Sequence, residues 1–182
     1  MKPFLRNPFE RMLQGLAYWL AYKGETYKCE IFEADAVTEA IQILLFQLPS
    51  GYKVVREFPY VSISKSFGGK RADLAILNAN NECECLIEFK LADATNERYE
   101  GDVIKMGGVK ACNPNLDCYV IILYRKSCKI DVPKKLVDNN GKAMKKEITV
   151  NSSQRIRVRR VCNAIRSQTA TNMKKVICIE VL

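Results

Sequence analysis

Two apolar segments joined by a polar turn make up residues 71–92, RADLAILNANNECECLIEFKLA. Residues 71–77 and 84–92 have the length and the apolar, β-branched composition that are typical of β-strands. Asn78-Ala79-Asn80-Asn81 lies between them and has the composition of a turn. The sequence therefore predicts an antiparallel hairpin.

Each strand of this hairpin carries an acidic residue, Asp73 in the first and Glu88 in the second. Acidic residues are uncommon inside a central strand unless they serve a purpose there. Strand alternation places Glu88 and Lys90 on one face. A turn centred near Asn80 brings Asp73 opposite Glu88. We therefore expect two carboxylates and one ammonium group to meet at an edge of the sheet.

Two adjacent carboxylates repel each other, which favours a divalent cation between them. Mg²⁺ suits such a pair because it is a hard ion that binds one or two carboxylates together with water and substrate phosphate. Lys90 could hold an attacking water or offset charge on the phosphate. The alternative is a surface Glu–Lys pair on an edge strand, with Asp73 at a strand start.

The pattern of Asp73 followed by Glu88-Phe89-Lys90, with fourteen residues between, resembles the PD-(D/E)xK nuclease superfamily. This is the only triplet of Asp or Glu, any residue and Lys in the chain. The order helix, three strands, helix, strand over residues 33–124 is similar to the common core of that family. The proline of the family motif is Ala72 here. The resemblance implies a restriction-endonuclease-like α/β fold, with a mixed central sheet flanked by helices.

The resemblance also implies a function, the metal-dependent hydrolysis of DNA phosphodiester bonds by an Mg²⁺-dependent deoxyribonuclease, with Mn²⁺ as a substitute. Asp73, Glu88 and the backbone carbonyl of Phe89 are the implied metal ligands, and Lys90 is implied to lie near the nucleophile.

An acid on the preceding helix often joins the site in this family. Glu39 is the first candidate because it lies within the amphipathic helix that leads into the first strand. Glu33 is the second, because the helix dipole alone explains an acid at a helix start.

Apolar periodicity outside the hairpin predicts the remaining elements. We expect helices at 8–22, 33–48 and 98–112, and strands at 52–64, 117–124 and 174–182. The chain is then a single domain, 1–182, with a core over about 33–124 and a basic C-terminal extension over 125–182.

Residues 152–166, SSQRIRVRRVCNAIR, fit two structures. Arginine alternates with Ile and Val as in a strand. Val158, Cys162 and Ile165 also share one helical face after a serine that could cap it. We favour the helix.

Charge is distributed unevenly along the chain, which carries a formal net charge of +9. Residues 1–100 hold 12 basic and 14 acidic residues, whereas residues 101–182 hold 17 basic and 6 acidic. A basic half indicates a polyanionic partner, most simply DNA, although an ordinary basic surface is the alternative. The candidate DNA-binding residues are Lys70, Arg71, Arg155, Arg157, Arg159 and Arg160.

The chain has no histidine, which excludes Ser-His-Asp catalysis and His-ligated metal sites. Its eight cysteines include no Cys-x-x-Cys pair, and most lie among apolar residues. We expect buried, reduced thiols and a cytoplasmic location. No apolar run reaches the length of a membrane helix, and the N-terminus does not have the pattern of a signal peptide.

Several alternatives stay open. The protein could bind nucleic acid without cleaving it, or its basic half could dock on an acidic protein in a larger complex. Aromatic residues near the N-terminus are expected in a helical core or at a homodimer surface: Tyr18, Trp19, Tyr22 and Tyr27. On the expected third helix, Asp102 and Lys105 are more simply explained as solvent-facing residues than as residues that face the sheet edge.

Overall fold

A computed structural model describes residues 3–23, 30–92, 96–124, 147–150, 154–164 and 174–182. Within them lie three α-helices, α1 (Pro3–Tyr22), α2 (Glu33–Leu45) and α3 (Asn96–Cys112), and two short 3-10 helices, η2 (Tyr60–Ser62) and η3 (Lys65–Phe67). The strands are β1 (Lys53–Pro59), β2 (Arg71–Leu77), β3 (Cys83–Ala92), β4 (Asp117–Tyr124), β5 (Ile148–Val150), β6 (Gln154–Ala164) and β7 (Lys174–Val181). The predicted strand at 71–77 and the one at 117–124 are confirmed, and the predicted helices agree to within a few residues.

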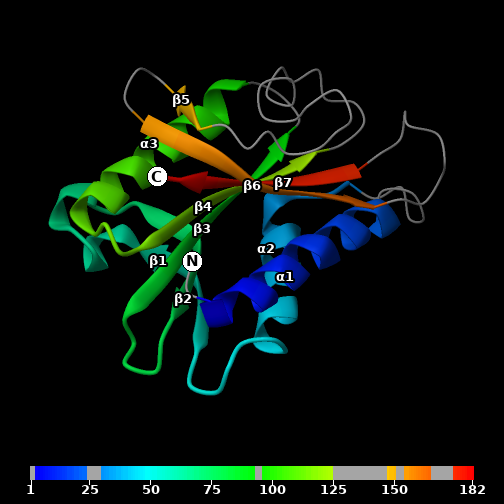
Figure 1. Ribbon diagram of the computed structural model, residues 1–182, viewed down its shortest axis with the longest axis horizontal. Coiled ribbons are helices and arrows are strands. Elements are labelled where there is room, and N and C mark those ends of the chain that lie inside the picture. Colours follow the sequence, from blue (N-terminus) through cyan, green and yellow to red (C-terminus); the bar gives the residue numbers. More distant parts are fainter. Residues whose placement is uncertain (1–2, 24–29, 93–95, 125–146, 151–153, 165–173) are drawn as a thin grey trace.

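All seven strands belong to one mixed sheet in the order β1-β2-β3-β4-β7-β6-β5 (Figure 1). Among the described strands only β3 and β4 pair in parallel, because α3 connects them as a crossover over one face of the sheet. The described residues after 124 add three strands to the sheet, and β7 pairs with β4. The α/β class and the mixed sheet predicted from the sequence are confirmed.

Helices cover the two faces of the sheet unequally (Figure 1). α1 and α2 pack on one face, where Phe9 of α1 stacks against Tyr119 of β4 with ring centroids 4.6 Å apart. α3 and η2 cover the other face and bury Val103, Met106 and Tyr60 against it. The alternating residues of each central strand supply both cores, so these strands are apolar along their whole length.

Away from its turn the hairpin has the predicted register, with Leu74 opposite Ile87 and Ala75 opposite Leu86, and the register shifts by one residue between Ile76 and Leu77. Its turn is built by Asn78, whose Oδ1 accepts hydrogen bonds from the backbone N–H groups of Asn80 and Glu82, both at 2.9 Å. Continuing the same register by one residue brings Asp73 beside Glu88.

The preference for a helix at 152–166 is wrong, because residues 154–164 form strand β6. Ile156 and Val158 point to the α3 face, so the arginines between them point to the α1 face. A register shift between Val158 and Arg160 then moves Cys162 to the α1 face. This irregularity breaks the strand alternation and leaves a spacing that also fits a helix.

The first strand ends earlier than the predicted 52–64. The chain leaves β1 at Pro59 and forms η2, which buries Tyr60. Glu57, two residues earlier, has a left-handed backbone with a φ of 53°, which is unusual for a residue with a side chain. Together these features carry the chain from the sheet edge over the α3 face.

A pair of glycines lies inside α3, where they are unfavourable for helix formation. A Cβ atom at Gly107 would lie 1.6 Å from Oε1 of Gln154 on β6, and one at Gly108 would lie 3.4 Å from the ring of Phe67. Gly107 therefore leaves room for the Gln154 side chain, whereas a Cβ at Gly108 would make an ordinary contact with Phe67.

Thiol labelling checks the prediction of buried cysteines. Cys85, Cys118 and Cys178 are buried, and burial raises the pKa of each thiol, whereas Cys112 is exposed. Under native conditions we expect an alkylating reagent to modify Cys112 and to leave the three buried cysteines unmodified, because the thiolate is the reactive form. Peptide mass spectrometry measures this, and labelling of Cys85 or Cys178 as fast as Cys112 would contradict the buried arrangement.

In the described part of the chain, no helix has the length and apolar character needed to cross a membrane.

Candidate functional site

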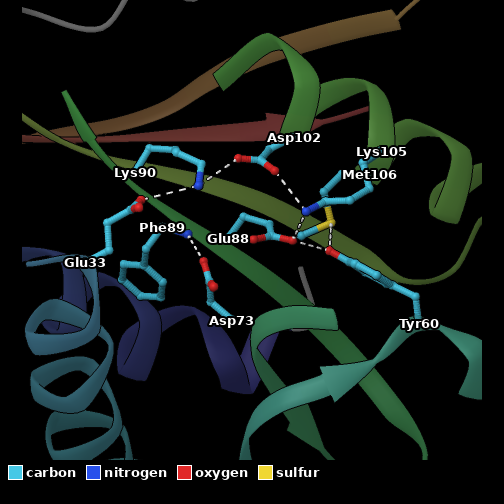
Figure 2. A network of polar contacts seen from close by, with 9 residues as sticks. All are labelled: Glu33, Tyr60, Asp73, Glu88, Phe89, Lys90, Asp102, Lys105 and Met106. Atoms are coloured by element: carbon cyan, nitrogen blue, oxygen red, sulfur yellow. Dashed lines mark hydrogen bonds and ion pairs between the residues drawn. The ribbon is translucent and has the colours of Figure 1, made fainter. Parts of the chain in front are cut away.

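The acidic residues of the hairpin meet on the α3 face of the sheet, where Figure 2 shows them with their neighbours. Asp73 Oδ2 accepts a hydrogen bond of 2.7 Å from the backbone N–H of Phe89, the residue after Glu88. This contact fixes the Asp73 carboxylate against β3. Phe89 itself is implied as a ligand through its carbonyl oxygen, but the contact that the structure records is made by its N–H.

Glu88 lies in the interior with only 3% of its surface exposed. Its Oε1 accepts a hydrogen bond from the hydroxyl of Tyr60 and lies 2.5 Å from Nζ of Lys105 (Figure 2). The oxygen of Tyr60 is also 3.6 Å from Met106 Sδ, and the Lys105 ammonium lies 5.4 Å from the centroid of the Tyr60 ring. A buried carboxylate is therefore held by one phenol and one ammonium group.

Burial raises the pKa of Glu88 to about 7, and the charge of Asp73 raises it as well. Lys105 and Tyr60 act in the opposite direction by hydrogen bonding. Burial and the nearby Glu88 charge raise the pKa of Tyr60, so its hydroxyl stays protonated and donates. A carboxyl group of this kind is typical of sites where charge has a function.

Lys90 joins the two helical layers at the end of the sheet. Its Nζ lies 3.3 Å from Glu33 Oε2 at the first residue of α2 and 3.3 Å from Asp102 Oδ2 on α3 (Figure 2). Burial alone would lower the pKa of Lys90, but Asp102 and Glu33 outweigh burial and raise it, so the side chain stays charged. Asp102 also binds Lys105, at 2.8 Å.

The site contains more negative than positive charge. Four carboxylates, from Glu33, Asp73, Glu88 and Asp102, surround two ammonium groups, from Lys90 and Lys105. Asp102 Oδ2 is buried and accepts no hydrogen bond, although the Lys90 ammonium is close. The unbalanced charge and the all-oxygen donor set fit Mg²⁺ chemically.

The carboxylates do not yet converge on one point. In the described residues, no group of three or more acidic or cysteine side chains is arranged to hold a metal ion. Beside Glu88, the Lys105 ammonium and the Tyr60 hydroxyl already contact Oε1. Holding Mg²⁺ therefore requires side chains to rearrange around Glu88 and Asp73.

The two candidates for the helix acid lie in different places. Glu33 contacts Lys90 and belongs to the site. Glu39, the first candidate, lines a separate pocket beside Trp19 and Lys23, between α1 and α2. The structure therefore brings Glu33, the first residue of α2, to the hairpin and not Glu39.

The sequence favoured a solvent-facing position for Asp102 and Lys105, and this prediction is wrong. Their side chains are only 13% and 19% exposed and point from α3 into the site. Tyr60 is a further site residue that the sequence analysis missed. For Asp102 and Lys105 the available signal was their spacing with Met106 on one face of the helix. The charge of Asp102 and Lys105 nevertheless favoured a solvent-exposed face.

The arginines of β6 lie on the other face of the sheet, and each contacts an acidic residue. The nearest atoms of the pairs are 3.2 Å apart for Arg155 and Glu147, 2.6 Å for Arg157 and Glu180, 3.8 Å for Arg159 and Glu180, and 2.6 Å for Arg160 and Glu10. The structure does not bring this cluster together with the hairpin carboxylates. Arg166 of the same sequence segment lies outside the described residues.

Lys70 and Arg71 are closer to the site than the arginines of β6. Arg71 begins β2, two residues before Asp73. Both basic residues are exposed, and within the described residues neither forms an ion pair. They are therefore available to an anionic ligand at the site.

The aromatic residues of α1 divide between the core and the surface. Trp19 packs against the core, while Tyr18 and Tyr22 are 58% and 45% exposed. Tyr27 lies outside the described residues.

Comparison with family models, with curated proteins and with solved structures finds no match. The functional interpretation therefore depends on the geometry of the site and on the sequence motif.

Proposed function

We propose that the protein is an Mg²⁺-dependent nuclease of the PD-(D/E)xK type that hydrolyses phosphodiester bonds in DNA. The observation that carries the proposal is the gathering of Asp73, Glu88, Lys90 and Glu33 at one end of the sheet. The motif residues come from the central hairpin and the further acid from the preceding helix, as the resemblance implies. The restriction-endonuclease-like core, α2 followed by β1 to β3, α3 and β4, is part of the same proposal.

Each residue has a role that its position supports. Asp73 and Glu88 are the metal ligands, because they lie side by side on one face and repel each other. When bound, Mg²⁺ would neutralise charge on the phosphate and favour ionisation of an attacking water. Lys90 positions that water, because its ammonium is held between Glu33 and Asp102 on the same face as Glu88. Lys70 and Arg71 contact the DNA backbone beside the site.

The test uses purified protein with four substrates: supercoiled, linear double-stranded and single-stranded DNA, and single-stranded RNA. We expect cleavage of DNA with Mg²⁺ or Mn²⁺ and none when EDTA removes the metal. Salt-dependent DNA binding without cleavage of any substrate would replace this proposal with the non-catalytic nucleic-acid-binding protein. If DNA is neither bound nor cleaved, the basic half is assigned to a protein partner instead.

A further inference from the structure

We propose that Lys105 is a built-in counter-cation, which holds Glu88 in the metal-free protein and gives it up when a divalent cation binds. The inference rests on the proposed function, because it concerns the same metal site. It adds a positioning residue that controls how tightly that site binds metal.

The contact geometry shows what Lys105 does in the metal-free state. Its Nζ is 2.5 Å from Oε1 of Glu88, and the same oxygen accepts the hydrogen bond of Tyr60 (Figure 2). Mg²⁺ binds carboxylate oxygens at about 2.0–2.1 Å. An ammonium group and a metal ion cannot share this oxygen at such distances without strong repulsion. The two cations therefore compete for Glu88.

Lys105 has a second partner that it can keep. Asp102 Oδ1 lies 2.8 Å from Lys105 Nζ, three residues earlier on the same helix. When Glu88 turns to another cation, Lys105 stays paired with Asp102, so its charge does not become isolated in a buried environment. The exchange needs only side-chain movement and leaves α3 in place.

The competition has a measurable consequence. Without Lys105, the buried carboxylate of Glu88 lacks its nearest positive charge, so together with the neighbouring Asp73 it attracts a divalent cation more strongly. The wild-type protein should therefore bind Mg²⁺ and Mn²⁺ more weakly than its acidic residues alone would allow.

The experiment compares Mn²⁺ affinity, measured by calorimetric titration in mildly alkaline buffer, across the wild type and three variants. Lys105→Met keeps the aliphatic stem and removes the charge, whereas Lys105→Arg keeps the charge. Lys110→Met is the matched control, because Lys110 lies on the same helix and binds the carbonyl of Leu116 instead of Glu88. We expect Lys105→Met to bind Mn²⁺ about tenfold more tightly or better, while the other two variants stay near the wild type.

A measurement on the wild type covers the case in which Lys105→Met does not fold. The side-chain NMR signal of Lys105 is assigned by its loss in Lys105→Arg, and it should shift as Mg²⁺ is added. A signal that stays fixed at saturating Mg²⁺ overturns the proposal, as does unchanged or weaker Mn²⁺ binding by a folded Lys105→Met protein.

Failure of this inference differs from failure of the proposed function. If Asp73→Asn abolishes Mn²⁺ binding but Lys105→Met does not strengthen it, the nuclease proposal stands and the role of Lys105 is rejected. If neither the wild type nor Lys105→Met binds Mn²⁺, the role of Lys105 and the proposed function are both rejected.

Discussion

Asp73→Asn should reduce Mg²⁺-dependent DNA cleavage by about 10²–10³-fold or more, the effect typical of losing one preorganised electrostatic group. Asparagine keeps the shape of the side chain, and its Oδ1 can still accept the hydrogen bond from the Phe89 N–H. The fold should therefore persist while the negative charge that attracts the cation is lost. The measurement is single-turnover cleavage, with thermal unfolding to show that the variant is folded.

Glu82→Gln is the matched control for this substitution. Glu82 lies at the turn of the same hairpin, is exposed, and contacts Asn78 rather than the site. The Glu82→Gln variant loses the same charge as Asp73→Asn and should cleave DNA at the wild-type rate. If Asp73→Asn cleaves as fast as this control, Asp73 is not a metal ligand.

Lys90→Met should cost about 10²–10⁴-fold in cleavage rate, the range for a positioned group that moves a proton or stabilises charge. Methionine preserves the packing of the aliphatic stem but has no charge, so water is no longer oriented beside the cation. Mn²⁺ affinity should stay the same or rise, because a positive charge next to the cation is removed. Single-turnover rates and calorimetric titration separate these two effects.

Two controls make the Lys90 result specific. Lys53→Met removes a lysine from the edge strand, where it contacts Asn81, and should leave the rate unchanged. Lys90→Arg keeps the charge but replaces the ammonium with a larger planar group that does not give up a proton. Rapid cleavage by Lys90→Met would reduce Glu88-Phe89-Lys90 to a chance triplet.

The hairpin could be predicted in detail because its information is local. Period-two alternation and a short asparagine-rich turn place Asp73 close to Glu88, although the pairing of Leu77 with Cys83 beside the turn is one residue out of the register that Leu74 and Ile87 follow. The face of Glu88 and Lys90 follows from this local pattern, whereas the register shift between Ile76 and Leu77 does not.

The partners of Glu88 could not be predicted because they depend on tertiary packing. Lys105 and Asp102 have a spacing that fits either a solvent-facing or a site-facing side of α3, and only the position of the helix over β3 decides between them. Tyr60 enters the site because β1 ends at Pro59. The apolar sequence around Pro59 does not predict that the strand ends there.

The structure and the ion-pair partners of the β6 arginines also could not be predicted from the local sequence. Their alternation predicts a strand, but the irregularity after Val158 adds a helical spacing to the same residues. Their acidic partners lie far away in the sequence, with Glu10 on α1 and Glu180 on β7. A count of arginines in one segment therefore overstates the positive charge that is available to a ligand.

The left-handed backbone of Glu57 has a consequence for how copies of this chain can meet. β1 is an outer strand of the sheet, and exposed outer strands can template hydrogen bonding with a neighbouring molecule. In β1, Glu57 interrupts the extended backbone, Pro59 removes an N–H donor, and Lys53 and Arg56 add exposed charge. β5, the opposite outer strand, has only three residues. In the part of the chain that the structure describes, both borders of the sheet therefore offer little backbone for pairing with another copy, and we expect any homodimer to form through side-chain surfaces.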